Sequence, residues 1–159
     1  MDFHNLSLKE QLQGLKKGSF SSTELTSHYL ERIEKYDDEL NSFISITAER
    51  ALIQAQNSDE RYANNQAYGL DGIPLAHKDI FCTKDVLTTC GSKMLHNFVS
   101  PYSSTVYEKL DAQGMVMLGK TNMDEFAMGS SNETSYFGPV KNPWNKESVP
   151  PISMCHCSS

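Results

Sequence analysis

The sequence lacks a long hydrophobic run, and no stretch approaches the ~20 apolar residues that a membrane-spanning helix needs. Its first residues, Met1 to Asn5, have neither the basic segment nor the apolar segment of a secretory signal. Basic residues are also scarce, since 14 Lys and Arg face 20 Asp and Glu, which gives a net charge of -6. A chain with this balance is not expected to bind nucleic acid through counterion release. We therefore predict a cytoplasmic protein that does not hold RNA by its own charge.

Cysteines are few, at positions 82, 90, 155 and 157. Because nothing indicates secretion, free thiols are expected rather than disulfides. Cys155-His156-Cys157 contains residue types that bind metals, but the spacing is too tight for an ordinary zinc site and no second pair supports it. The sequence therefore predicts neither a metal site nor a cofactor site in this chain.

The composition that is present, with 38% hydrophobic and 21% charged residues over 159 positions, is typical of a folded chain with a core or of a piece of a larger domain. A first helix is expected from Ser7 to Gly18, with its leucines at 8, 12 and 15 facing inward. Ser21 and Glu24 form the pattern of a capping box for a second helix. The second helix carries an apolar stripe of Leu25, Tyr29, Ile33, Tyr36 and Leu40. Such a stripe indicates core packing, although it could also bind a partner subunit.

The rest of the first 68 residues is also predicted to be mainly helical. A short strand at 43–46 precedes a helix that Thr47 is expected to cap, with Ala48, Ala51, Leu52 and Ala55 inward. From Asn57 to Tyr68 the composition becomes polar, and we expect the helix to fray into a loop before Gly69.

Residues 69–149 have the pattern of an α/β unit. A strand is expected to end near Lys78, a helix to run from about 104 to 113 with Val106 and Leu110 buried, and an apolar strand to follow over 115–120. Helix, glycine and buried strand in this order predict a crossover between parallel strands. The composition changes after Val149-Pro150, and residues 150–159 form a tail without periodicity.

The stretch from Gly72 to Phe81 contains the most informative residue, Lys78, at the end of an apolar run. A lysine kept in a low-dielectric site is shifted toward its neutral form and can then act as a base. The alternative is a strand end whose lysine extends to water. The small polar segment 88–93 is either an ordinary surface loop or a loop beside a site, and Thr121 to Gly129 follow the last strand at the edge where open α/β sheets place their sites.

Four segments resemble the amidase signature family in composition and order. They are Gly-Ile-Pro-Leu-Ala-His-Lys-Asp at 72–79, Thr-Thr-Cys-Gly-Ser at 88–92, Gly-Lys-Thr-Asn-Met-Asp-Glu-Phe-Ala-Met-Gly at 119–129, and Asn-Pro-Trp at 142–144. The resemblance covers about residues 5–149. Within the family, residues 124–135 are similar to the glutaminase subunits of tRNA-dependent amidotransferases. The resemblance implies a single amidase domain with a mixed β-sheet covered by helices on both faces.

The resemblance also implies a catalytic role for Lys78. In the family, the lysine of this motif is the base of a Ser–cis-Ser–Lys triad and acts through a bridging serine on a nucleophilic serine, which follows the general logic of an activated hydroxyl. The family places both serines in glycine- and serine-rich segments after Val-Pro. Here Val149-Pro150 leads instead into Pro151, Ile152 and Ser153. Ser153 falls near the register of the bridging serine, but its neighbours do not match and the role is not carried over to it.

We therefore interpret the chain as the N-terminal part of a glutaminase subunit that lacks its nucleophile, and a frameshift or early stop would explain the abrupt change after Pro150. The whole enzyme is expected to release ammonia from glutamine, to assemble with two partner subunits, and to leave ATP, magnesium and most of the tRNA to a partner. The alternatives are a stand-alone amidase for small amides, or a chain without enzymatic activity that only docks a helical partner or is a product of gene decay.

Overall fold

The computed structural model describes residues 2–150. The chain begins with a short 3-10 helix, Phe3–Asn5, and two helices, α1 (Leu8–Lys17) and α2 (Ser22–Leu40). Both expected starts are confirmed, because the Ser7 and Ser21 side chains accept hydrogen bonds from the backbones of Glu10 and Glu24 in complete capping boxes. Gly18 ends α1 in the left-handed conformation, as its position predicts.

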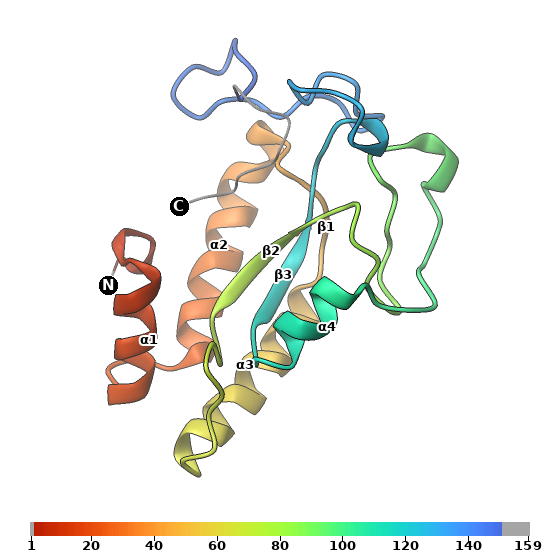
Figure 1. Cartoon of the computed structure of the whole chain (residues 1–159). Coiled ribbons are helices and arrows are strands. Elements are labelled where there is room, and N and C mark those ends of the chain that lie inside the picture. The colour runs from red at the N-terminus through yellow and green to blue at the C-terminus, as the bar shows by residue number, and fades with distance from the viewer. Residues whose placement is uncertain (1, 151–159) are drawn as a thin grey trace.

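The sheet has three strands in the order β1-β3-β2, where β1 is Phe43–Ile46, β2 is Pro74–Lys78 and β3 is Val116–Thr121. β2 and β3 are parallel and β1 is antiparallel to β3, so the sheet is mixed (Figure 1). The connection from β2 to β3 includes α4 (Thr105–Asp111), which confirms the predicted crossover. All six residues of the central strand β3 are buried.

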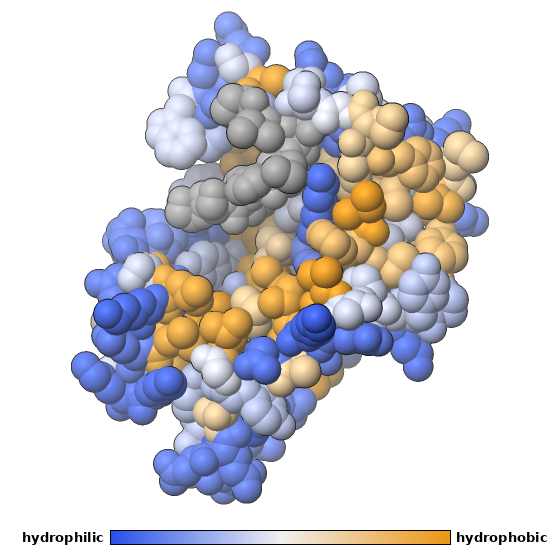
Figure 2. All heavy atoms as spheres, viewed as in Figure 1, coloured by the Kyte–Doolittle hydropathy of each residue, from blue (hydrophilic) through white to orange (hydrophobic). Residues whose placement is uncertain are grey.

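Helices cover both faces of the sheet, as expected. In Figure 1, α2 and α3 (Ala48–Ala63) lie behind the strands and α4 lies in front of them. Residues of β3 alternate between these layers: Val116 and Leu118 pack with alanines of α3, whereas Met117 packs with Tyr107 of α4. A third apolar cluster joins α1 and α2 to the start of β2. In the same view, apolar side chains form a band that runs from α1 across the middle of the molecule toward the loops on the right (Figure 2).

The predicted end of α3 is confirmed, because the helix ends at Ala63 and a loop follows before Gly69. The polar residues of α3 make tertiary contacts instead of facing only water. The Asp59 carboxylate accepts hydrogen bonds from the backbone N–H groups of Ser22 and Thr23 at the start of α2. Arg61 forms a bidentate ion pair with Asp71, with both N–O distances at 2.7 Å. The polar residues near the end of α3 thus form contacts with α2 and with the segment before β2. Periodicity in the sequence does not reveal such contacts.

Some residues that were predicted to face the core are exposed. Val106 is exposed and the neighbouring Tyr107 is the buried residue of α4, since its ring fills the space against Met117. Leu8 and Ala48 are exposed because each lies in the first turn of its helix, beyond the edge of the core. Thr47 precedes α3 as expected, but its hydroxyl donates to the Met117 carbonyl and does not cap the helix.

The stripe on α2 belongs mainly to the core. Leu25 is fully buried, and Tyr29 and Ile33 pack against the apolar clusters. Tyr36 is the exposed member, and the cationic groups of Arg32 and Lys35 lie over its ring. Two further 3-10 helices, Lys93–Leu95 and Glu125–Ala127, lie in the loops at the C-terminal ends of β2 and β3.

Candidate active site

Lys78 is the last residue of β2, where the sequence placed it. Its position pairs with Thr121, the last residue of β3, so both side chains project from the same face at the C-terminal edge of the sheet. Lys78 is half-buried, and no hydrogen bond or ion pair to its ammonium is found among residues 2–150. The Thr121 hydroxyl is buried and likewise has no partner within the described chain. The Lys78 amine and the Thr121 hydroxyl therefore both have unused hydrogen-bonding capacity within the described chain. A neutral Lys78 amine could accept a proton here, and both groups could bind a polar ligand.

His77 precedes Lys78 and, because side chains alternate along a strand, faces the opposite side of the sheet. Its ring stacks on Phe81 at 4.7 Å between centroids and lies 5.8 Å from the ring of Tyr107. Burial, followed by the nearby positive charge of Lys120, lowers the pKa of His77 from 6.5 to about 4. His77 is therefore a neutral core residue at physiological pH, and its apolar neighbours fix the end of β2.

Lys120 of β3 is the fully buried lysine of this edge. Its ammonium donates to the Phe81 carbonyl at 2.8 Å and to the Thr88 hydroxyl at 3.0 Å, and it lies 3.3 Å from a carboxylate oxygen of Asp79. The last contact is an ion pair without good hydrogen-bond geometry, since that oxygen makes no hydrogen bond in the described chain. Burial lowers the pKa of Lys120, and the charge of Asp79 opposes this shift. The ammonium is thus surrounded by two hydrogen-bond acceptors and one carboxylate.

Asp79 is also fully buried, and its other carboxylate oxygen accepts from the backbone N–H of Thr89 at 2.8 Å and from the Thr89 hydroxyl at 2.5 Å. The segment 88–92 is therefore not an ordinary surface loop, because it wraps around the residue that follows Lys78. Cys90 in this segment has a positive φ of 53°. Burial, and secondarily the Asp79 charge, raise the pKa of the Cys90 thiol, which makes it a poor nucleophile.

The segment after β3 is held by a second buried carboxylate, Asp124. It accepts from the backbone N–H groups of Asn132 and Thr134 and from the Thr134 hydroxyl, at 2.9, 3.1 and 2.7 Å. Burial alone would raise the pKa of Asp124, but these hydrogen bonds outweigh it and lower the pKa. The neighbouring Glu125 accepts from the Ser92 hydroxyl at 2.5 Å and ties this segment to the loop that follows β2. Two loops that are far apart in the sequence are thus joined at the C-terminal edge of the sheet.

Sequence reasoning missed most of this support. It left open whether Lys78 lies in a low-dielectric site or extends to water, and it did not single out Lys120, which is the fully buried lysine. A signal was present, because position 120 ends an apolar run just as position 78 does. Ser153, Cys155 and Cys157 lie outside the described residues. Cys82 and Cys90 are free thiols, as expected. Within residues 2–150, no group of three or more His, Cys, Asp or Glu side chains could hold a metal ion.

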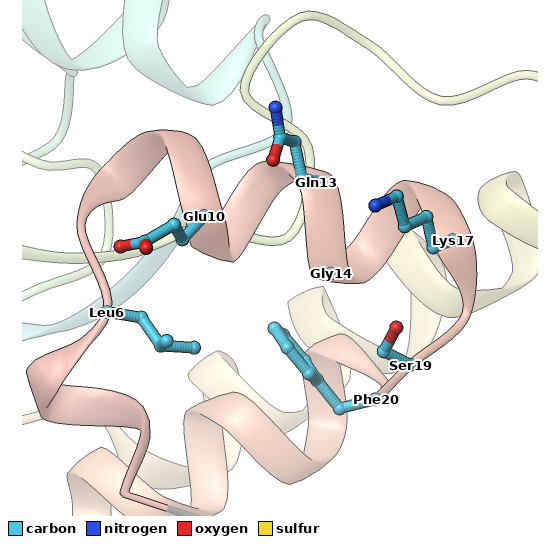
Figure 3. Close-up of a pocket in the computed structure, with 7 residues that line it drawn as sticks. All are labelled: Leu6, Glu10, Gln13, Gly14, Lys17, Ser19 and Phe20. Carbon is cyan, nitrogen blue, oxygen red and sulfur yellow. The ribbon is translucent and has the colours of Figure 1, made fainter.

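A cavity of about 220 Å³ lies on a different part of the molecule, between α1 and the segment that leads into α2 (Figure 3). The Phe20 ring points toward Gly14 of α1 across this space, and a Cβ at position 14 would collide with that ring. None of its lining residues comes from the strand ends that carry Lys78 and Lys120. No helix in the described part of the chain is both long and apolar enough to pass through a membrane.

Comparisons with known proteins agree with this geometry. The family model for Amidase matches residues 24–153. The A subunit of the glutamyl-tRNA(Gln) amidotransferase of Alcanivorax borkumensis is 61% identical over 152 residues, which are 92% of this chain and 31% of that protein. The crystal structure of the corresponding protein from Thermotoga maritima has a TM-score of 0.78 at 33% identity and covers 98% of this chain and 31% of its own.

A second solved structure, the native peptide amidase from Stenotrophomonas maltophilia, has a TM-score of 0.88 at 28% identity and covers 97% of this chain and 33% of its own. The chain therefore spans about a third of the length of the relatives it matches. The matched region contains Lys78, Lys120 and the loops that join them. On these grounds, the chain belongs to the amidase family.

Proposed function

We propose that this chain is the base-bearing part of a glutaminase subunit of a glutamyl-tRNA(Gln) amidotransferase. The observation that carries the proposal is the 61% identity with the A subunit of such an enzyme across 92% of the chain, in a region that includes Lys78. The whole subunit would release ammonia from glutamine, and the complex would use the ammonia to convert Glu-tRNA(Gln) into Gln-tRNA(Gln).

Lys78 is the catalytic residue of the proposal. Its amine has no internal partner in the described chain and lies at the C-terminal edge of a parallel strand pair, where α/β sheets bind their ligands. In the family, such a lysine acts as a base through a bridging serine on a nucleophilic serine. The role is not assigned to Lys120, because its ammonium already donates to Phe81 and Thr88 and forms an ion pair with Asp79.

The 159-residue polypeptide is proposed to be inactive by itself. Its sequence contains no counterpart of the two glycine- and serine-rich segments that carry the family's serines, and no role is assigned to Ser153. Losing the nucleophile of a triad costs on the order of a millionfold in rate. The residues that remain can position a base but have no hydroxyl to activate.

The proposal includes the B and C subunits as partners in a cytoplasmic heterotrimer. ATP and magnesium would be used by the partner subunit, which would also hold most of the tRNA, in keeping with the net charge of -6 of this chain. The role proposed for this chain uses neither ATP nor magnesium.

The experiment is an assay of ammonia release from glutamine by the purified polypeptide, alone and with the B and C subunits. We expect no turnover above background. Turnover that disappears in Lys78→Ala but persists in Lys84→Ala, an exposed lysine, would overturn the inactivity proposal, because the base would then be working with an unrecognised nucleophile.

A stand-alone amidase for small amides is the second candidate, and the similarity to a peptide amidase supports it. Co-purification separates the two, since association with the B and C subunits is expected only of the amidotransferase.

A third possibility is a chain that only docks the helical C subunit through its N-terminal helices, or is a product of gene decay. A pull-down against that subunit tests it, and the burial of most of the α2 stripe leads us to expect weak or no capture by these helices alone.

A further inference from the structure

Lys120 contacts three residues that follow Lys78 in the sequence. Its ammonium contacts the carbonyl of Phe81, the hydroxyl of Thr88 and the carboxylate of Asp79. All of these groups belong to residues 79–88, directly after the end of β2. Lys120 itself lies on β3, which is the central and fully buried strand. The central, fully buried strand therefore holds the chain that leaves Lys78.

Asp79 completes the connection, because its backbone is fixed as firmly as its side chain. Its N–H donates to the Thr121 carbonyl at 3.2 Å, and its carbonyl accepts from the Cys90 N–H at 3.3 Å. On the other side of Lys78, His77 is buried between aromatic rings. The residues before and after Lys78 are thus both immobilised, while the Lys78 side chain is left without a partner in the described chain.

We propose that Lys120 is a positioning residue for Lys78: its contacts with Asp79, Phe81 and Thr88 fix the backbone that leaves β2 and so set the direction of the Lys78 amine. The proposal deepens the proposed function and rests on it only for the role of Lys78 as base. The positioning itself is a property of residues 77–90 and does not depend on the reaction.

Stability alone is a poor reason for this pair. Burying two charges costs several kcal/mol of desolvation for each ion, and well-packed apolar residues of similar volume are often equally stable or more stable. Lys120 also donates to a backbone carbonyl and to a threonine hydroxyl, and these contacts together fix one specific path for the chain after β2. That is the property a catalytic base needs, because a misplacement of about 1 Å can reduce a rate by about a hundredfold.

The test uses the full 159-residue chain labelled with ¹³C at lysine Cε, with the Lys78 and Lys84 signals assigned through Lys→Arg substitutions. Two variants are compared with the parent: Lys120→Met, which leaves Asp79 buried without a counter-charge, and Lys120→Met/Asp79→Asn, which removes both charges and leaves an amide oxygen for Thr89. Urea unfolding measures stability, and amide hydrogen exchange measures the protection of Asp79 and Cys90.

In Lys120→Met we expect the Lys78 signal to move or broaden and the exchange of the Cys90 amide to speed up by about a hundredfold, as breaking a buried pair predicts. The Lys84 signal should stay unchanged, which shows that the fold persists, and the exchange of the buried Leu25 amide should speed up by no more than the loss of global stability requires. In the double variant, the urea midpoint should return toward the parent value while the Lys78 signal stays displaced.

The last result separates positioning from stability, since a purely structural pair would restore both. A Lys78 signal at the parent position in either folded variant overturns the proposal. If Lys120→Met does not fold, the double variant alone decides. Failure here leaves the proposed function untouched, because that function is tested by ammonia release and co-purification, and an inactive chain can still show the coupling.

Discussion

Two lysines lie at the C-terminal edge of the same parallel strand pair, and their surroundings are opposite. Lys78 ends β2, half-buried and without a partner for its ammonium among residues 2–150, whereas Lys120 is fully buried on β3 with three acceptors around its ammonium. Burial alone would have selected Lys120 as the base. The comparison supports the proposal that Lys78, whose donors are unoccupied within the described chain, is the base, and that Lys120 is part of the framework that holds it.

The largest expected effect on stability comes from breaking the buried pair on one side. Lys120→Met leaves the Asp79 carboxylate buried with only the Thr89 donors and leaves the Phe81 carbonyl without its lysine donor. We expect a loss of about 3–5 kcal/mol in the free energy of unfolding, measured by urea denaturation. The Lys120→Met/Asp79→Asn variant is the control and should recover most of the loss. A loss below about 1 kcal/mol in the single variant would mean that the carboxylate reaches water, so that the pair is not a buried one.

The next effect depends on pH and comes from His77, beside Lys120. Its pKa is about 4 in the folded chain and near 6.5 when the chain is unfolded. Above pH 6.5 the ring is neutral in both states and the stability is complete. As the pH falls from 6.5 toward 4, the unfolded chain binds a proton that the folded chain does not, so up to about 3 kcal/mol of stability is lost.

Urea unfolding measured between pH 7 and pH 4 checks this slope. His77→Phe, which keeps the ring contacts with Phe81 and Tyr107, should remove that part of the pH dependence while the contribution of the carboxylates remains. Lys120→Met should weaken the slope, because the positive charge that lowers the pKa of His77 is gone. Equal slopes in the parent and in His77→Phe would contradict the assignment.

Sequence patterns predicted the elements of this site better than its interior. Capping boxes, the apolar runs of β2 and β3 and the glycine after α4 gave the helices, the strands and the parallel crossover, since these depend on local propensity and periodicity. The pattern also gave Lys78 its place at the sheet edge. It did not reveal that Asp79 pairs with Lys120, a residue of the next parallel strand, because strand register and loop path decide which charges meet.

The contacts of the polar residues near the end of α3 were not predicted, for the same reason. Asp59 and Arg61 resemble solvent-facing residues until the start of α2 and Asp71 are placed against them. Polar residues in contact across elements carry no periodic signal, whereas the family resemblance identified Lys78 without any of these contacts. The sequence thus predicted the framework of the fold and the position of the proposed base, and the structure was needed for the groups that hold the base.

A small effect on stability is expected for Lys78 itself. Because its ammonium has no partner within the described chain and is half-exposed, Lys78→Met should change the free energy of unfolding by about 0.5 kcal/mol or less. The contrast with Lys120→Met, measured under the same urea conditions, sharpens the comparison between the two lysines. A loss in Lys78→Met as large as in Lys120→Met would reveal a partner for the Lys78 ammonium and would make its proposed availability wrong.

The last effect, and the only one expected to be favourable, concerns the hydroxyl beside Lys78. Thr121 is buried and its hydroxyl has no partner within the described chain, so it incurs a desolvation cost that no hydrogen bond offsets. Thr121→Val keeps the shape and should raise the free energy of unfolding by up to about 1 kcal/mol. Thr89→Val is the matched control, because that buried hydroxyl donates to Asp79 at 2.5 Å and its removal should lower stability by about 1–3 kcal/mol. If Thr121→Val is destabilising as well, the Thr121 hydroxyl has a partner in solution, and the register of β2 and β3 makes the Lys78 amine the first candidate. In that case Lys78→Met combined with Thr121→Val should show a non-additive effect, which a double-mutant cycle measures.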